Sequence, residues 1–207
     1  MTEHYFSPQP QAPHRPGRVR VILPDVYLEL ATDAGVFSPA RLDPGTRLLL
    51  DAVPPPPASG DLLDLGCGYG PIACVLAARS PGATVWAVDV NERALELCAR
   101  NAATAGLANV RCVTPGDAAL PAQFAGIWSN PPIRVGKQAL HELLGGWLGC
   151  LGPGGRAYLV AGRNLGADSL HRWLAEQGWP VTRLAAQAGY RLLQVSSRAE
   201  RTVVTPP

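Results

Sequence analysis

Residues 61–71 read DLLDLGCGYGP, and they carry the strongest indication of the fold class. The leucine-rich run 61–65 is typical of a short buried β-strand, and it leads directly into three glycines that alternate with other residues. Glycines allow a tight turn and a close approach of the backbone to a ligand, and Pro71 suits the first position of a helix. The stretch therefore predicts a strand, a glycine-rich loop and a helix whose free N–H groups face a ligand.

From residue 61 onward, short apolar runs alternate with helical stretches, which indicates a parallel, doubly wound α/β sheet. The expected strands are 61–65, 84–88, 109–113, 125–129, 156–161, 181–186 and 191–196. The expected helices are 71–79, 91–105, 136–150 and 167–177. Only a short turn with Gly189 joins the last two strands, so we expect an antiparallel hairpin at the edge of a seven-stranded Rossmann-like sheet.

The N-terminal part lacks this alternation of apolar runs and helical stretches. Residues 1–17 are polar and carry four prolines, which predicts an extended arm. Hydrophobicity alternates over 18–30 on both sides of Pro24-Asp25, which predicts a small β-hairpin, and a helix is expected at 44–53. The predicted organisation is an arm and hairpin extension over 1–40, a main domain over 41–200 and a tail over 201–207.

Composition excludes several classes of protein. The chain has 207 residues, and a hydrophobic content of 47% suffices for a core and excludes wholesale disorder. The net charge of +2 excludes a protein that attracts nucleic acid over its whole surface, but it does not exclude a local basic patch. We expect no membrane span, because no apolar run approaches the required ~18 residues, and no signal peptide. The five cysteines form no CxxC pair or zinc spacing, so we expect free thiols in a reducing cytoplasm and no metal.

Three carboxylates follow three of the expected strands. Asp64 precedes the first glycine by two residues, Asp89 ends the second strand, and Asp117 follows the third. Such folds bind ligands at the carboxyl ends of parallel strands, and an acid in the position of Asp89 binds ribose hydroxyls in NAD and in S-adenosylmethionine (SAM) alike. Three acids suit a nucleoside that also carries an amine. Pro71 stands where the dinucleotide pattern G-x-G-x-x-G needs its third glycine, which disfavours NAD.

The expected strand 125–129 ends in Asn130-Pro131-Pro132-Ile133. The prolines fix the backbone and lack N–H donors, so carbonyl oxygens face the ligand as acceptors. The side-chain oxygen of Asn130 and the main-chain oxygen of Pro131 match the two hydrogens of a planar amino group. Held in this way, the nitrogen lone pair turns toward an electrophile, which is catalysis by positioning and electrostatics without a covalent intermediate.

Together these residues resemble class I SAM-dependent methyltransferases over roughly residues 35–197. More narrowly, the chain resembles the methyltransferase small family, which includes RsmC-type enzymes that methylate the exocyclic N2 of guanine in small-subunit ribosomal RNA. Four stretches carry this likeness: 33–38 (DAGVFS), 42–50 (LDPGTRLLL), the glycine loop and 130–137 (NPPIRVGK).

The resemblance implies a role for each matching residue. The cofactor-binding residues would be Asp64, Gly66, Cys67, Gly68, Gly70, Asp89, Val90, Asp117, Ala118 and Asn130. The catalytic residues would be Asn130, Pro131, Pro132 and Ile133. Phe37 and Ser38 would line the pocket as substrate-binding residues. Independently of the resemblance, Arg134 and Lys137 follow the Asn-Pro-Pro motif and are further candidates for substrate binding, which could hold RNA phosphates or begin a solvated helix.

Two features depart from the family. Ile133 stands where many amino-methylating relatives carry an aromatic residue that stacks on the target base. Bacterial two-domain members also carry an additional N-terminal methyltransferase-like half, for which 207 residues leave no room. Substrate docking would then rest on a partner or on the N-terminal hairpin and loops. There, the arginines at 15, 18 and 20 beside Tyr5 and Phe6 could stack on unpaired bases or form a flexible surface arm.

The expected function is a cytoplasmic transfer of the methyl group of SAM to an exocyclic amine, with guanine N2 of small-subunit ribosomal RNA as the leading acceptor. The expected partner is ribosomal RNA or the small subunit, and the expected state is a monomer or weak dimer. One alternative is the same chemistry on adenine N6 in nucleic acid, on a glutamine amide of a protein or on a small molecule. A second is a non-catalytic RNA-binding or ribosome-assembly module with a vestigial SAM pocket. A third is an NAD-dependent dehydrogenase, which Pro71 and Asn-Pro-Pro disfavour.

Overall fold

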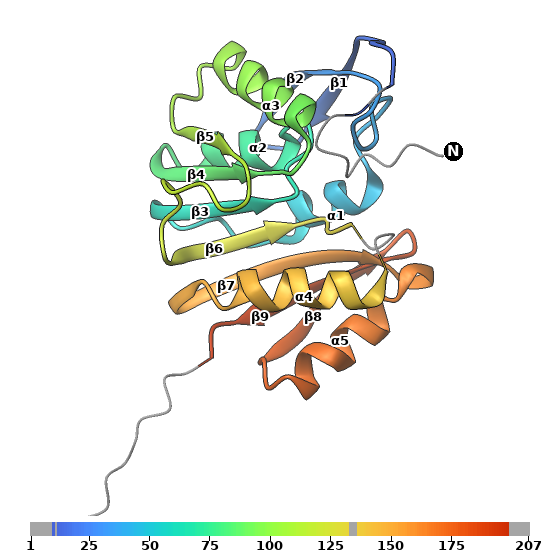
Figure 1. Ribbon diagram of the computed structural model, residues 1–207, viewed down its shortest axis with the longest axis vertical. Helices are drawn as coiled ribbons and strands as arrows, with labels where there is room; N and C mark the ends of the chain where they lie inside the picture. Colours follow the sequence, from blue (N-terminus) through green and yellow to red (C-terminus); the bar gives the residue numbers. More distant parts are fainter. Residues whose placement is uncertain (1–9, 11, 133–135, 199–207) are drawn as a thin grey trace, which may run out of the picture.

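The structure, a computed structural model, describes residues 10, 12–132 and 136–198. A two-stranded hairpin precedes a seven-stranded sheet, whose strand order is β5-β4-β3-β6-β7-β9-β8. Helices cover both faces of this sheet, and the hairpin lies beside α3 at one end of the molecule (Figure 1). The architecture is therefore the α/β Rossmann-like fold that the sequence predicts.

The strands are β1 (Gly17–Ile22), β2 (Tyr27–Thr32), β3 (Ser59–Leu65), β4 (Gly82–Val88), β5 (Val110–Val113), β6 (Phe124–Ser129), β7 (Leu151–Gly162), β8 (Val181–Gln187) and β9 (Tyr190–Ser196). The helices are α1 (Pro44–Ala52), α2 (Pro71–Arg79), α3 (Glu92–Thr104), α4 (Lys137–Leu148) and α5 (Ala167–Glu176), with a short 3₁₀ helix η2 (Arg163–Leu165).

Strand directions confirm the predicted mixed sheet. The pairs β3–β4, β4–β5, β3–β6 and β6–β7 are parallel, whereas β9 runs antiparallel to both β7 and β8. The prediction for β7 was too short, because the strand begins at Leu151 rather than at 156. The glycine-rich stretch 152–155 bulges between the pairs Phe124–Leu151 and Gly126–Arg156, and its composition hides the start of the strand.

Alternating strand residues fill two cores, one on each face of the sheet. Leu62 packs with the core that α1, α2 and α3 cover, and Leu63 packs with the core under α4 and α5. Both leucines are fully buried, as expected for a central parallel strand with helices on both sides.

The hairpin forms as predicted and shares the first of these cores. Its turn at Pro24-Asp25 is closed by a hydrogen bond from Leu23 N to Val26 O of 2.9 Å. The inward residues Val19, Val21 and Leu30 are buried together with residues of α2 and α3. The hairpin therefore adds to the main domain, and the division of the chain at residue 40 stays a prediction.

Two global properties follow from the described residues. All five cysteines are free, and Cys67, Cys74 and Cys98 are buried, while the other two are half-buried. Within the described ranges, no helix combines the length and the apolar character that crossing a membrane requires.

Candidate active site

A cavity of about 630 Å³ lies at the carboxyl ends of β3, β4 and β6, next to the loop between β2 and α1. Because β3 lies between β4 and β6, this is the point at which the chain changes direction across the sheet. Ten of the predicted site residues line the cavity: Phe37, Ser38, Gly66, Cys67, Gly68, Asp89, Val90, Asn130, Pro131 and Pro132. Residues from 36 to 190 thus meet at one site.

Other predicted residues do not line this cavity. They are Asp64, Gly70, Asp117, Ala118 and Lys137, and Pro115 lines the wall nearest to Asp117 in sequence. Ile133 and Arg134, together with Tyr5 and Phe6 of the predicted arm, lie outside the described residues.

The glycine loop forms an open cradle. Gly66 and Gly68 have positive φ angles of 76° and 55°, and a Cβ atom added at either would meet no atom within 4 Å. The N–H groups of Gly66 and Cys67 donate to the Val88 carbonyl over 2.8 and 3.1 Å, which holds the loop against β4. Gly70 has a packing role instead, because a Cβ there would lie 2.5 Å from Cys98 Sγ.

Asp64 lies beneath this loop and is fully buried. Its Oδ2 accepts a hydrogen bond of 2.8 Å from Ala73 N in the first turn of α2, whereas Oδ1 has no partner among the described residues. Burial raises the pKa of this carboxyl to about 8, and the charge of Asp89 adds to the shift. The oxygen without a partner therefore belongs to a carboxyl group that burial favours in its protonated form, below the glycine cradle.

Asp89 links the end of β4 to the glycine loop. Its Oδ2 accepts from Gly68 N and its Oδ1 from Asn91 N, both over 2.9 Å. Burial raises the pKa of Asp89, while the backbone N–H donors oppose that shift. Each oxygen keeps further acceptor capacity toward the cavity, which suits the hydroxyl groups of a ribose.

Asn130 presents a defined edge of its amide. Ser129 Oγ donates to Leu65 O over 2.7 Å and so fixes the end of β6 on β3. The Asn130 Nδ2 group donates to Asp43 Oδ1 over 2.9 Å and to Thr46 Oγ1 over 3.0 Å. Since both amide hydrogens are engaged at the start of α1, the side-chain oxygen of Asn130 is the group left to accept a hydrogen bond from a ligand.

Asp43 and Tyr190 are cavity residues to which the sequence analysis assigned no role. Asp43 is buried and caps α1, because its Oδ1 accepts from Gly45 N and Thr46 N over 2.8 and 3.0 Å. Its Oδ2 accepts from the Tyr190 hydroxyl over 3.2 Å. A Cβ at Gly45 would lie 2.6 Å from the Tyr190 ring, so only glycine allows this contact. An aspartate directly before a proline is a sequence pattern for the start of a helix, so the position of Asp43 could have been noticed from Pro44. No local pattern in the sequence marks Tyr190.

The loop between β2 and α1 forms another wall of the cavity, and α3 holds it in place. Asn91 Nδ2 donates to Gly35 O and Arg93 Nη1 to Ala34 O, both over 2.8 Å. Ser38 lies in this loop with a φ of 47°, a left-handed conformation that is uncommon outside glycine and gathers at functional sites.

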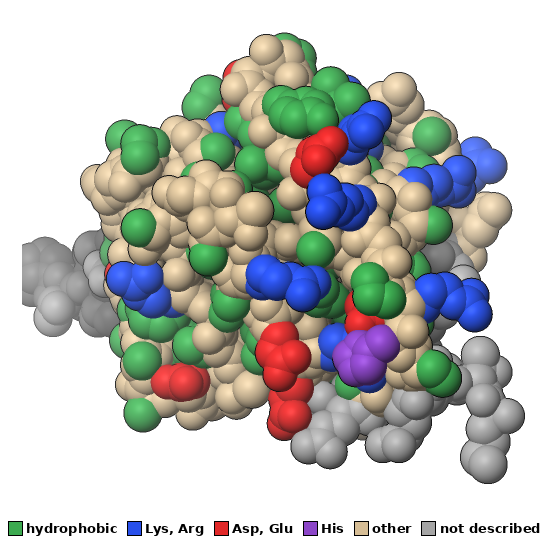
Figure 2. Space-filling view, turned by 90° about the horizontal axis from the view of Figure 1, so that it is seen from above, with side chains coloured by type: hydrophobic (Ala, Val, Ile, Leu, Met, Phe, Trp, Pro, Cys, Tyr) green, Lys and Arg blue, Asp and Glu red, His purple; other side chains and the backbone are tan. Residues whose placement is uncertain are grey.

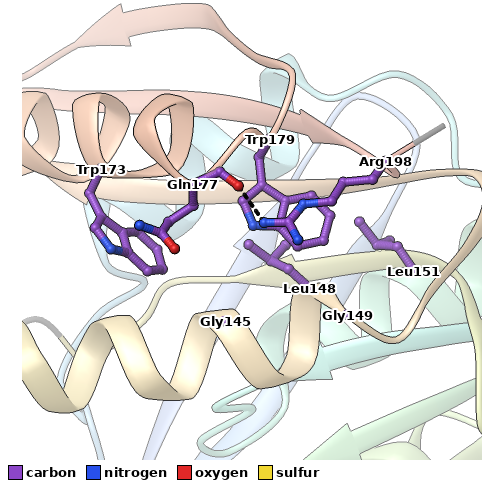
Figure 3. A pocket seen from close by; sticks show the side chains of 8 residues that line it. All are labelled: Gly145, Leu148, Gly149, Leu151, Trp173, Gln177, Trp179 and Arg198. Atoms are coloured by element: carbon purple, nitrogen blue, oxygen red, sulfur yellow. Dashed lines mark hydrogen bonds between the residues drawn. The ribbon is translucent and has the colours of Figure 1, made fainter. Parts of the chain in front are cut away.

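A second cavity, of about 450 Å³, lies between α4 and α5 and contains none of the predicted site residues. The Arg198 guanidinium covers the ring of Trp179 at 4.0 Å from its centroid and donates to the carbonyl of Gln177 (Figure 3). These contacts pack the end of the described chain against the second core.

The sequence model of the methyltransferase small domain family matches residues 27–194. This chain belongs to that family. It is therefore a methyltransferase of the class that uses SAM as methyl donor, and the cradle and the position of Asp89 fit such a cofactor. No cluster of three or more metal-binding side chains occurs within the described part of the chain.

Relatives of this methyltransferase include the uncharacterized protein YbxB of Bacillus subtilis, which is 34% identical over 94% of this chain and 98% of its own length. The ribosomal RNA small subunit methyltransferase C of Pseudomonas aeruginosa is 34% identical over 88% of this chain and 57% of its own length. The enzyme of the same name from Shewanella amazonensis is 34% identical over 76% of this chain and 47% of its own length. The chain thus spans about half the length of the relatives with that name.

A similar solved structure is described as the T. thermophilus 16S rRNA N2 G1207 methyltransferase (RsmC) in complex with AdoMet and guanosine. Its TM-score is 0.77 at 27% identity, over 90% of this chain and 52% of that one. A ribosomal protein L11 methylase from Lactobacillus delbrueckii shares the fold, with a TM-score of 0.59 at 22% identity over 76% of this chain and 84% of its own.

Proposed function

We propose that this methyltransferase transfers the methyl group of SAM to the exocyclic N2 of guanine in small-subunit ribosomal RNA. The observation that carries the proposal is the orientation of Asn130, whose Nδ2 group is tied to Asp43 and Thr46. Its side-chain oxygen is thereby left to accept from an amino group, with the conformationally fixed Pro131 and Pro132 beside it in the cavity wall.

The cofactor side of the cavity has three parts, one for each portion of SAM. Gly66, Cys67 and Gly68 would hold the methionine portion above Asp64, and Asp89 with Val90 would bind the ribose. Pro115 would lie along the adenine, and Asp117 and Ala118 follow it in the sequence. When bound, SAM supplies an electrophilic methyl group on a positively charged sulfur.

The acceptor side would work by positioning. The Asn130 oxygen and the Pro131 carbonyl accept the two hydrogens of the target amine, which turns the nitrogen lone pair toward the methyl donor. As the nitrogen bonds to the methyl carbon, the bond from that carbon to the sulfur would break, and its electron pair would leave with the sulfur as a neutral thioether. The nitrogen would become positively charged, and the two carbonyl dipoles would stabilise that charge. Water takes the proton that the methylated nitrogen then releases, so the site needs no histidine as a base.

The names of the relatives support ribosomal RNA as the substrate. Two of them are ribosomal RNA small subunit methyltransferases, and the T. thermophilus structure contains AdoMet, which is SAM, and guanosine. We propose that ribosomal RNA or the small subunit is the partner, that the reaction takes place in the cytoplasm, and that the enzyme works as a monomer or weak dimer. Lys137, exposed at the start of α4, would contact the RNA backbone.

Two variants separate the two halves of this proposal. Asn130→Ala should leave the Kd for SAM unchanged and lower turnover on RNA by about 10²-fold, as expected for the loss of a preorganised contact in the transition state. Asp89→Ala should do the reverse and weaken SAM binding strongly, because a partly buried ribose loses its acceptor. Calorimetric titration with SAM and single-turnover methyl transfer measure both effects. Equal turnover of Asn130→Ala and wild type would remove Asn130 from the mechanism.

A further inference from the structure

The outer face of the hairpin carries the side chains of Arg18, Arg20 and Ile22 on β1 and of Tyr27 and Glu29 on β2. Successive side chains of a strand point to opposite faces, so the residues at the alternate positions of β1 and β2 point into the core. Ile22 and Tyr27 face each other across the strands and are 56% and 59% exposed. An aromatic ring left this open to solvent, beside two arginines, is an unusual outer surface for a small hairpin.

Positive charge gathers beside this face. A hollow of about 440 Å³ is lined by Arg18, Arg20, Glu29 and Arg41, together with neighbouring apolar residues. Three arginines and one glutamate give this hollow a formal charge of +2, which equals the net charge of the whole chain. Arg15, which the sequence analysis grouped with two of these arginines, does not line the hollow. Figure 2 looks down on the end of the molecule that carries the hairpin and shows Lys and Arg side chains spread between hydrophobic ones.

Glu29 leaves these arginines available to a ligand. Its carboxylate lies 3.1 Å from Arg20 Nε and 3.8 Å from Arg18 Nη1. The Arg18 and Arg20 side chains are 81% and 69% exposed, and ion pairs so open to solvent contribute little to stability. Their guanidinium groups can therefore donate hydrogen bonds to phosphate oxygens in a forked geometry.

The loop between β2 and α1 contributes residues to both the hollow and the active-site cavity. Phe37, Ser38 and Asp43 line the active-site cavity, while Ala40, Arg41 and Leu42, which lie between them, line the hollow. From Arg18 to Ile22, β1 extends this surface by about 13 Å toward the turn of the hairpin, at ~3.3 Å per residue. A strand of nucleic acid that leaves the cavity over Arg41 would next meet the outer face of the hairpin.

We propose that the hollow and the outer face of the hairpin bind an unpaired RNA segment next to the target base. Arg18, Arg20 and Arg41 contact its phosphates, and Tyr27 stacks on one of its bases. Arginines beside an exposed aromatic ring match single-stranded RNA, whose backbone is charged and whose bases are free to stack. The inference rests on the proposed function, because it assumes that the cavity receives a base of RNA.

Binding of a labelled single-stranded RNA oligonucleotide and methyl transfer to ribosomal RNA test this inference at several salt concentrations. The variant R18Q/R20Q/R41Q should weaken binding about tenfold. It should also reduce the slope of log K against log salt by about 2, since each single-strand phosphate contact contributes ~0.7. Its Kd for SAM should stay unchanged. The matched control R111Q/R156Q/R172Q removes three exposed arginines elsewhere and should behave like wild type. Y27A should weaken RNA binding without changing the salt slope.

The outcomes separate this inference from the proposed function. If the wild type transfers methyl groups to RNA and R18Q/R20Q/R41Q has the same affinity and salt slope as the control, the hairpin surface does not bind RNA. If the wild type binds SAM but neither binds nor methylates any RNA, the proposed function falls first and this inference falls with it. If Y27A binds RNA as well as wild type while R18Q/R20Q/R41Q binds it more weakly, the arginines contact RNA but Tyr27 does not stack on a base.

Discussion

At the scale of single residues, Asn130 depends on an acid that lies 87 positions away in the sequence. An asparagine amide can rotate by half a turn and exchange its oxygen for its nitrogen. The Asp43 carboxylate opposes that exchange, because it can only accept and it faces Nδ2, whereas the Thr46 hydroxyl could serve either orientation. The same Asp43 caps α1, so one carboxylate fixes both the start of the helix and the orientation of the Asn130 amide.

Replacement of Asp43 by serine should therefore lower kcat by about tenfold or more. Serine still caps a helix, but its shorter side chain does not reach Asn130, and a lost hydrogen bond to a charged group costs about 1.5–3 kcal/mol. The Kd for SAM should change little. Asp43→Asn serves as the control, because its amide oxygen can still accept from Asn130 and from the helix. Equal kcat values for both variants and wild type would show that Asp43 does not position Asn130.

Asp64 predicts a particular dependence of stability on pH. Its pKa of about 8 in the folded protein lies above the ordinary value of 3.8, so between these values the folded state holds a proton that the unfolded state has released. The free energy of unfolding should therefore fall as pH rises from about 4 to about 8. Asp64→Asn cannot ionise and should lack this contribution. In urea unfolding without SAM between pH 5 and 8.5, the free energy of unfolding of the variant relative to that of wild type should therefore rise with pH. The same pH dependence in both proteins would contradict a buried, protonated carboxyl.

At the scale of elements, α3 connects the hairpin to the glycine loop. Asn101 of α3 is buried, accepts from Ala31 N over 2.7 Å, and donates to Ala31 O and Tyr69 O over 2.9 and 2.8 Å. One side chain thus joins β2, α3 and the residue that follows Gly68. The proposed RNA surface and the cofactor cradle are fixed to the same helix.

The variant Asn101→Ala should lower the free energy of unfolding by about 1–3 kcal/mol, because it leaves backbone groups of Ala31 and Tyr69 without partners. Arg100→Ala, on the exposed side of the same helix, should stay within about 0.5 kcal/mol of wild type. Chemical denaturation of the three proteins measures the difference. Asn101→Ala as stable as Arg100→Ala would mean that the hairpin is held by its apolar face alone.

The elements themselves were largely predictable from the sequence. Periodicity located the strands and helices of the sheet, and the hydrophobic alternation around Pro24-Asp25 located the hairpin, because each of these signals is local. The first residues of β7 escaped prediction, since their glycines and proline suggest a turn and only pairing with β6 makes them part of the strand. The left-handed conformation of Ser38 escaped it too, because a serine carries no sequence signal for a positive φ.

At the scale of the whole molecule, the sheet order explains which site residues could be foreseen. The glycine loop, Asp89 and Asn130 follow three adjacent parallel strands, so their convergence follows from the fold class alone. Asp43 and Tyr190 reach the cavity by packing between distant elements, and no spacing in the sequence encodes their meeting. Asp64 was predicted to bind the cofactor, and its role stays a prediction; its complete burial, which keeps it out of the cavity wall, is a property of the folded core.

We propose that Asn130 directs a methyl transfer to guanine N2 of small-subunit ribosomal RNA. The most direct measurement transfers labelled methyl groups from SAM to 30S subunits and to naked ribosomal RNA, both taken from cells that lack this protein. The RNA is then digested to nucleosides, and the label is identified. We predict label in N2-methylguanosine with wild-type enzyme and about 10²-fold less with Asn130→Ala. Label in N6-methyladenosine or in the protein fraction, or SAM binding without any transfer, would contradict the claim.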